Sequence, residues 1–314
     1  MTENDPKFVV QQEIVAAGLA TLDPVDKTYL IGGAETEATI LRNRAAIERR
    51  ALRPRVLVDV SQLNLKTQII NQIAQLPIFL APIGALHRFH SDGNTAAGAA
   101  ASKTGLPMFF GGLSPQPPAE MRAATSHDAV YQLYVQGDAG WVDEQVQQIE
   151  DLGFNGLCLT VDSAVYSRRE RDMLRRFTKP WRKAFSPEAM NHQASFSWKD
   201  VGRIRRNCKL PLILKGITSP EDARLAVEHG VDVVYVSNHG GRQLDHARGT
   251  LDTLEEVKTA VSPSTKLFID GGFMRGTDIV KALAMGADAV GIAVWMVPSE
   301  AREGVPRVAA SRLR

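Results

Sequence analysis

The chain has 314 residues, of which 44% are hydrophobic and 23% are charged, the composition of an ordinary globular protein. A formal net charge of +2 gives no reason to expect a nucleic-acid partner, and no apolar run approaches the ~20 residues that a membrane span needs. The two cysteines, Cys158 and Cys208, have neither a CxxC nor a metal-ligand spacing, so we expect buried thiols, no metal site and a cytoplasmic location.

The first part of the chain, residues 1–76, has the pattern of a helical segment. Apolar residues recur at helical spacing from Val9 to Leu19, and residues 34–52 form a longer candidate helix rich in Ala, Glu and Arg. Between these helices Tyr29 precedes two glycines, which interrupt regular structure. We expect residues 1–76 to pack as an N-terminal extension on the domain that follows.

From residue 77 to residue 294, strand-like apolar runs alternate with helix-like segments. The runs are Ile78–Ala81, Pro107–Phe110, Ala129–Val135, Gly156–Val161, Pro211–Lys215, Val231–Val236, Lys266–Ile269 and Ala289–Val294. Helices are expected at Gly93–Lys103, Pro118–Ala124, Gly137–Leu152, Trp198–Asn207, Ser219–His229, Leu251–Val261 and Arg275–Met285. Eight such alternations predict an α/β protein of the (β/α)8 TIM barrel class, with its chemistry at the carboxyl ends of the strands. The alternative is a doubly wound open sheet, but the turn at residues 81–84 lacks the GxGxxG pattern typical of that fold.

One connection is longer than the others. Residues 177–196 carry two prolines and little periodicity, which predicts a mobile loop over the mouth of the barrel.

The stretch after the sixth predicted strand is poor material for a core. The apolar run that ends at Val236 is followed by Ser237, Asn238, His239, two glycines and Arg242. A histidine changes protonation near neutral pH, glycines allow close approach of a ligand, and an arginine presents a planar fork to a carboxylate. On these residues alone, a capped strand with a surface turn remains the alternative.

The sequence Ser-Asn-His-Gly-Gly-Arg-Gln-Leu-Asp at residues 237–245 resembles the signature of the FMN-dependent 2-hydroxy acid oxidases and dehydrogenases, the glycolate oxidase and lactate oxidase family. The resemblance extends over roughly Tyr29 to Val290. It implies FMN as cofactor, oxidation of a small L-2-hydroxy acid to the 2-oxo acid, and oxygen or another electron acceptor. It also implies a homo-oligomer, a tetramer or octamer. The 177–196 connection is shorter than in membrane-bound members, which favours a protein that does not bind membranes.

Residue by residue, the resemblance assigns roles to the ends of successive predicted strands. His239 would be the base and Asp162 the carboxylate that orients it. The substrate-binding residues would be Tyr29, Tyr134, Arg169 and Arg242. The cofactor-binding residues would be Pro82, Ile83, Gly84, Gly111, Gln132, Thr160, Lys215, Ser237, Asp270, Gly271, Gly272 and Arg275. Each also has an ordinary structural explanation, since Asp162 could cap a helix and Lys215 could extend to solvent.

The chain departs from the family pattern at several of these strand ends. Gly111 stands in place of a serine, and Leu113 replaces an aromatic residue, which should widen the substrate pocket. Met274 occupies the position of an arginine that faces the phosphate, so that Arg275 would have to neutralise it in a changed geometry. Ala293 and the residue after it replace a Gly-Arg pair that completes the phosphate site.

Residues 295–314 form an atypical short tail without an amphipathic repeat. We therefore expect the eighth barrel helix and the further C-terminal helices of the family to be truncated, through a natural truncation or an altered reading frame near Ile292. Two alternative functions stay open. One is a degenerate, non-enzymatic paralogue with weakened or lost FMN binding, and the other is another FMN barrel such as an isopentenyl diphosphate isomerase-like enzyme.

Overall fold

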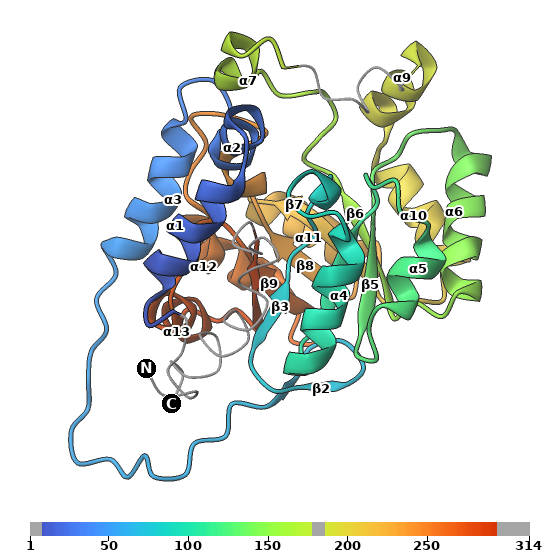
Figure 1. Cartoon of the computed structure of the whole chain (residues 1–314). Helices are drawn as coiled ribbons and strands as arrows, with labels where there is room; N and C mark the ends of the chain where they lie inside the picture. The colour runs from blue at the N-terminus through green and yellow to red at the C-terminus, as the bar shows by residue number, and fades with distance from the viewer. Residues whose placement is uncertain (1–7, 178–185, 294–314) are drawn as a thin grey trace.

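The computed structural model describes residues 8–177 and 186–293 (Figure 1). Within these residues, eight parallel strands close into a barrel in which each strand pairs with the next along the chain. The last strand pairs with the first, with Val290 opposite Ile78. The strands are β3 (Ile78–Leu80), β4 (Met108–Gly111), β5 (Ala129–Leu133), β6 (Gly156–Thr160), β7 (Leu212–Ile217), β8 (Val233–Val236), β9 (Lys266–Ile269) and β10 (Ala289–Ile292). The predicted barrel is therefore confirmed.

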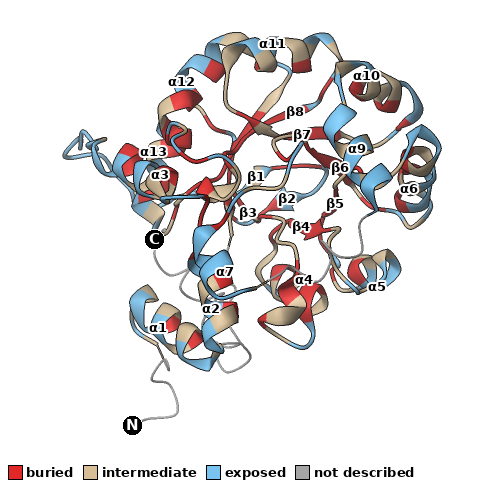
Figure 2. Cartoon of the chain, turned by 90° about the horizontal axis from the view of Figure 1, so that it is seen from above, coloured by how far each residue is buried: buried red, intermediate tan, exposed pale blue. Residues whose placement is uncertain are grey.

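Helices surround the barrel as an outer ring, seen from above in Figure 2. They are α4 (Gly93–Thr104), α5 (Pro118–Ala123), α6 (Ala139–Asp151), α10 (Trp198–Asn207), α11 (Pro220–Glu228), α12 (Thr250–Ala260) and α13 (Gly276–Ala284). The start of α11 illustrates how the sequence sets such boundaries. Ser219 accepts a hydrogen bond from the Asp222 amide, and Pro220 occupies the first helical position, where no amide donor is needed.

The N-terminal extension contains one helix that the sequence pattern did not predict. Its elements are α1 (Gln11–Thr21), α2 (Pro24–Ile31) and α3 (Ala38–Glu48). In α2, the side chain of Asp23 accepts hydrogen bonds from the amides of Val25 and Asp26, and Pro24 follows at the first position. This Asp-Pro start is a recognised helix signal, and the short length of α2 hid its periodicity.

The long predicted helix at residues 34–52 is shorter in the structure because a distant carboxylate organises its start. Asp245, at the end of the sequence signature, accepts hydrogen bonds from the amides of Thr36 and Thr39 and from the Thr36 hydroxyl. Although burial opposes ionisation, these donors hold the pKa of Asp245 well below its usual range. The charge of Asp245 therefore fastens α3 to the loop after β8.

The predicted loop at residues 177–196 is wrong for its second half, where Pro187–Ser195 form the helix α9. Ser186 caps α9 by accepting from the Ala189 amide, with Pro187 at the first position. The same Ser-Pro-Glu start was recognised at α11, but the few apolar residues of α9 gave no helical stripe. Residues 178–185 of this connection and the tail at 295–314 lie outside the described residues.

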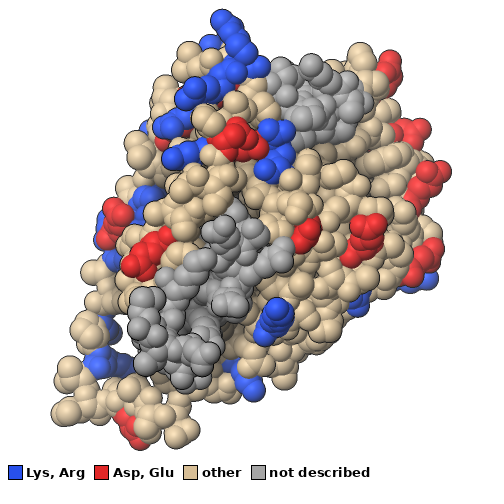
Figure 3. Space-filling view, in the orientation of Figure 1, with Lys and Arg blue, Asp and Glu red and all other residues tan. Residues whose placement is uncertain are grey.

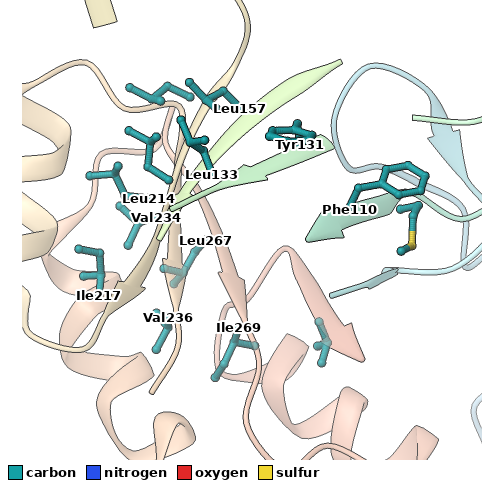
Figure 4. Packing of buried hydrophobic residues seen from close by; sticks show 14 of the residues in the cluster. Phe110, Tyr131, Leu133, Leu157, Leu214, Ile217, Val234, Val236, Leu267 and Ile269 are labelled. Carbon is teal, nitrogen blue, oxygen red and sulfur yellow. The ribbon is translucent and has the colours of Figure 1, made fainter. Parts of the chain in front are cut away.

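Successive residues of each strand point alternately into the barrel and toward the helices. On β8, Val234 and Val236 belong to the outer cluster with Leu157, Leu214 and Leu267 (Figure 4). Val233 and Tyr235 point inward. The hairpin of β1 (Thr67–Gln68) and β2 (Ile73–Ala74) closes the end of the barrel opposite the carboxyl ends of the strands. Its apolar residues Ile69, Ile70 and Ala74 pack with the side chains that point into the barrel.

Aromatic rings fill the barrel interior. The ring of Phe79 lies 4.4 Å from that of Phe109, 5.1 Å from that of Phe268 and 5.3 Å from that of Tyr235, measured between centroids. The Tyr235 hydroxyl donates to Asp270 at 2.8 Å. Gly291 makes room for this hydroxyl, because a Cβ at that position would lie 2.4 Å from it and 2.9 Å from Phe79.

We predict that Gly291→Ala lowers the free energy of unfolding by about 1–3 kcal/mol, because the added methyl overpacks the barrel interior. Urea denaturation followed by circular dichroism measures the change. Adding Tyr235→Phe removes the closest clash and should recover part of the loss. Gly140→Ala on α6 is the matched control, since its nearest contact would be an ordinary 3.4 Å; an equal loss in that variant would contradict the overpacking explanation.

Candidate active site

A cavity of about 420 Å³ opens at the carboxyl ends of the strands, where α7 (Glu170–Leu174) and α9 lie above the barrel (Figure 1). Every predicted strand end and the end of α2 contribute to its wall. Among the predicted site residues, the wall includes Tyr29, Pro82, Ile83, Gly84, Tyr134, Arg169, Lys215, His239, Arg242, Asp270, Gly271 and Gly272. The others, Gly111, Gln132, Thr160, Asp162, Ser237 and Arg275, are not part of the wall.

His239 lies between an acceptor and a donor. Its Nδ1 is 3.0 Å from a carboxylate oxygen of Asp162, and its Nε2 is 3.2 Å from the hydroxyl of Tyr134. Since an ionised carboxylate can only accept, we infer that Nδ1 carries the proton and that Nε2 is free to accept. The arrangement gives His239 the geometry of a proton acceptor whose ring is held by Asp162.

The electrostatic surroundings keep this histidine neutral. Burial lowers the pKa of His239, Asp162 opposes that shift, and the nearby positive charge of Lys215 adds to it. Burial would raise the pKa of Asp162, but its interaction and hydrogen bond with His239, followed by the positive charge of Lys215, lower it overall. The pair therefore combines a neutral imidazole with an ionised carboxylate near pH 7.

Two arginines on the outer side of the cavity face the ring of Tyr29. The guanidinium carbons of Arg242 and Arg169 lie 5.1 Å and 5.7 Å from its centroid. Arg242 donates to the carbonyls of Leu30 and Gly32, at 3.0 Å and 2.6 Å. Thus the C-terminal end of α2 fixes the orientation of Arg242.

Arg169 is buried without full compensation. Burial, followed by the neighbouring Arg242, lowers the pKa of Arg169 to about 10. Its Nη1 is buried and has no hydrogen-bond partner among the described residues. Within the same part of the chain, no ion pair includes Arg169 or Arg242. Two guanidinium groups that form no ion pair can bind an anion.

Lys215 brings a third positive charge to the floor of the cavity. Its Nζ donates to the Ser237 hydroxyl at 2.8 Å and lies 3.7 Å from a carboxylate oxygen of Asp270. Ser237 in turn donates to the other oxygen of Asp270 at 2.7 Å. Burial disfavours the charged form, yet the carboxylates of Asp270 and Asp162 raise the pKa of Lys215 overall. Lys215 therefore remains an ammonium group in a buried position.

The remaining predicted residues occupy distinct places. Gln132 donates to the Thr160 hydroxyl at 2.9 Å, which joins the ends of β5 and β6 behind the wall. Gly111 ends β4, and a Cβ there would lie 2.5 Å from the carbonyl oxygen of Ile83. Arg275 is exposed at the start of α13.

Several wall residues were not found from the sequence. Tyr166 and Gln243 come from irregular connections, where no periodicity marks them. Gln193 lies on α9, the helix that was taken for a loop, and its amide donates to the Ser163 carbonyl. Phe89, which stacks on Tyr29, lies just after a short 3₁₀ turn and carries no motif.

Basic side chains also gather on the surface near α7, at the top of the molecule in Figure 3. Arg168 and Arg171 are at least half exposed there, each paired with a glutamate. They lie next to Arg169 of the cavity wall in the sequence.

The barrel mouth thus combines a histidine hydrogen-bonded to a carboxylate, a buried lysine and two arginines without an ion pair in the described part of the chain, an arrangement suited to binding an anion beside a proton acceptor. The model of the FMN-dependent dehydrogenase family matches residues 20–311. The chain is 38% identical over 308 residues to L-lactate oxidase of Nostoc sp., which covers 89% of this chain and 84% of that protein. It is 36% identical over 303 residues to glycolate oxidase of Spinacia oleracea, covering 89% and 82%.

Solved structures agree with these relatives. A crystal structure of mandelate oxidase superimposes with a TM-score of 0.88 and 32% identity, covering 98% of this chain and 92% of that one. Another mandelate oxidase structure carries a C4a-OH-FMN adduct. The chain therefore belongs to the family of FMN-dependent 2-hydroxy acid oxidases, and its cofactor is FMN.

The residues present suit the flavin ring better than the phosphate. Lys215 supplies a buried positive charge, and Gly271 and Gly272 line the cavity with positive φ angles and no side chains. Beyond them, Met274 carries no charge, and its amide is already bonded to Asp278. These residues therefore fit the flavin ring, whereas position 274, where the family pattern has an arginine that faces the phosphate, supplies no cation.

Two further features are limited to the described residues. No helix there is both long and apolar enough to cross a bilayer. No cluster of three or more His, Cys, Asp or Glu side chains is arranged to hold a metal ion in the same part of the chain.

We predict that Met274→Arg strengthens FMN binding about 10- to 100-fold, because a charge-assisted hydrogen bond contributes about 1.5–3 kcal/mol. Titration of the apoprotein by flavin fluorescence measures the dissociation constant. Riboflavin, which lacks the phosphate, is the control ligand and should bind both variants equally. A parallel gain for riboflavin would place the new arginine away from the phosphate.

Proposed function

We propose that this protein oxidises a small L-2-hydroxy acid to the corresponding 2-oxo acid, with His239 as the proton acceptor. The supporting observation is the neutral imidazole of His239, hydrogen-bonded to Asp162, beside two arginines that form no ion pair among the described residues. The relatives support the substrate class, since they are named lactate, glycolate and mandelate oxidases.

The substrate carboxylate binds between Arg242 and Arg169. The fork geometry of a guanidinium suits both oxygens of a carboxylate, and burial strengthens the attraction. Tyr29, whose ring lies against both guanidinium groups, adds its hydroxyl to this site. Binding the carboxylate compensates the charge that Arg169 carries in a buried position.

Oxidation removes two electrons and two protons from the 2-hydroxy acid. When bound, FMN would provide the acceptor for the two electrons and for one of the two protons. The Nε2 atom of His239 takes a proton from the substrate, and Asp162 stabilises the resulting imidazolium and holds the ring in place. Burial raises the pKa of Tyr134, so its hydroxyl stays neutral and orients the substrate hydroxyl toward His239. Lys215 stabilises negative charge that develops at the cavity floor.

The pocket wall is permissive at the position of Leu113. A Cβ on Gly84 would lie 3.3 Å from the Leu113 side chain, so a small and a medium residue face each other there. Lactate, glycolate and mandelate are therefore all suitable test substrates. Reoxidation by oxygen or another acceptor, and assembly into a homo-oligomer, are carried over from the family as part of the proposal.

A second candidate function is a barrel that binds a ligand but does not turn over substrate. The uncharged Met274 favours it, because weaker phosphate binding lowers FMN occupancy. Purified protein distinguishes the two. Yellow protein that is bleached by a 2-hydroxy acid without oxygen supports the enzyme, whereas colourless protein that stays inert with added FMN supports the binding module.

We predict that His239→Gln lowers the rate of anaerobic flavin reduction by about 10²- to 10⁴-fold, the usual contribution of a general base. Stopped-flow absorbance measures this rate. Flavin content should match that of the unmodified protein, since the FMN contacts proposed above do not include His239. Undiminished reduction in the variant would remove the base assignment.

The pH dependence tests the electrostatics of the same pair. Because His239 must be neutral to accept a proton, kcat/KM should rise with pH through a pKa below 6.5. Asp162→Asn removes the group that stabilises the imidazolium and so lowers the pKa of His239. The rise of kcat/KM with pH should therefore occur at lower pH, while the maximum value of kcat/KM at high pH falls. A rise that moves to higher pH would contradict this account of the pair.

A further inference from the structure

Three elements meet at the cavity rim around Tyr29. They are α2, the 3₁₀ turn η1 (Leu86–Arg88) and Phe177, which ends the described part of the connection after β6. Nε of Arg88 donates to the carboxylate of Asp26 on α2 at 2.6 Å, and a second guanidinium nitrogen contacts the same oxygen. This ion pair is largely buried, with side-chain exposures of 22% and 11%.

The same arginine joins an aromatic group. Its guanidinium carbon lies 4.9 Å from the centroid of the Phe177 ring, and that ring lies 5.5 Å from the ring of Tyr29. The neighbouring Phe89 stacks on Tyr29 at 6.0 Å with an interplanar angle of 14°. We call Asp26, Arg88, Phe89 and Phe177 the rim clasp. Together they join α2 and its Tyr29 ring to the residues that follow β3 and β6.

The position of α2 matters for more than Tyr29. The carbonyls of Leu30 and Gly32, at its C-terminal end, accept both hydrogen bonds from Nη1 of Arg242. A shift of α2 would therefore displace Tyr29 and release Arg242 together. The rim clasp links α2 to the barrel only a few residues before this contact.

A buried ion pair is a poor device for stability alone. Removing both charges from water costs about as much as their attraction returns, so an apolar pair would stabilise the fold equally well. Burial indeed raises the pKa of Asp26 despite the arginine beside it. What the ion pair adds is a fixed orientation of α2 relative to η1.

We propose that Arg88 is a positioning residue for the substrate carboxylate. Through Asp26 and Phe177 it holds α2, so that the Tyr29 hydroxyl and the Arg242 guanidinium face the cavity before substrate arrives. The inference rests on the proposed function, since it needs a carboxylate bound by Tyr29 and Arg242. Preorganisation of this kind lowers the ordering cost of binding and acts on affinity more than on the chemical step.

Arg88→Met, which keeps the length and removes the charge, should raise the KM for the 2-hydroxy acid about tenfold and change kcat less than about threefold. The dissociation constant of oxalate, read from the perturbed flavin spectrum, should rise by a similar factor and needs no turnover. Arg88→Lys, which keeps the charge opposite Asp26, should recover part of the affinity. If Arg88→Met does not fold, Asp26→Asn breaks the same pair with an isosteric group.

A double-mutant cycle separates positioning from general destabilisation. Tyr29→Phe removes the hydroxyl that the rim clasp is proposed to hold, so adding Arg88→Met should cost at least threefold less oxalate affinity than it costs alone. Arg203→Met is the matched control, because Arg203 is 23% exposed and pairs with Asp143 between α10 and α6, away from the cavity wall. That variant should leave KM and oxalate binding unchanged.

Independent, multiplicative effects in the cycle would overturn the proposal. So would a lower midpoint of thermal unfolding for Arg88→Met with unchanged oxalate affinity. If the unmodified protein bound no oxalate and was not reduced by any 2-hydroxy acid, both the proposed function and this inference would fall. If it did both and Arg88→Met behaved identically, the inference alone would fail.

Discussion

The structure depends on positive charge buried at the mouth of an apolar barrel. Lys215, Arg169 and Arg242 come from three different strand ends, and burial penalises the charge on Lys215 and Arg169. Closed-barrel geometry makes such convergence possible, since all eight carboxyl ends surround one cavity. Only Lys215 has a carboxylate partner nearby among the described residues. In the proposed function, the substrate carboxylate supplies the ion-pair partner that the two arginines lack, so that substrate binding also compensates buried charge.

The N-terminal extension is part of this site rather than an addition to it. Asp245 holds the start of α3, and the buried side chain of Asn43 exchanges hydrogen bonds with Asn238, next to His239. Residues 195 and 209 positions apart in sequence are thereby held together around the loop after β8. Two members of the sequence signature, Asn238 and Asp245, thus serve to fasten the extension, while their neighbours His239 and Arg242 face the cavity.

The barrel could be predicted from sequence because strands buried on both faces leave continuous apolar runs, and the polar groups that follow them are conspicuous. The site was partly predictable for the same reason: Lys215 and His239 each follow such a run. Helices α2 and α9 were missed, since short helices with few buried residues carry no periodicity. The Asp26–Arg88 pair could not be found, because nothing in either local sequence indicates a partner about sixty residues away.

The two ends of the cavity are specified to different degrees. Around the proposed substrate site, each polar group has several restraints: Asp162 and Tyr134 on His239, two carbonyls on Arg242, and the ring of Tyr29 against both arginines. At the phosphate end, Gly271 and Gly272 provide space, but Met274 provides no charge. Affinity for the cofactor must then come mainly from contacts to its ring, where Lys215 is held by Ser237 and Asp270. Because Ser237 also accepts from the amide of His239, the group that holds the lysine also fixes the backbone of the base. In the proposed function, binding of the flavin ring and proton transfer therefore depend on one set of hydrogen bonds, which does not include position 274.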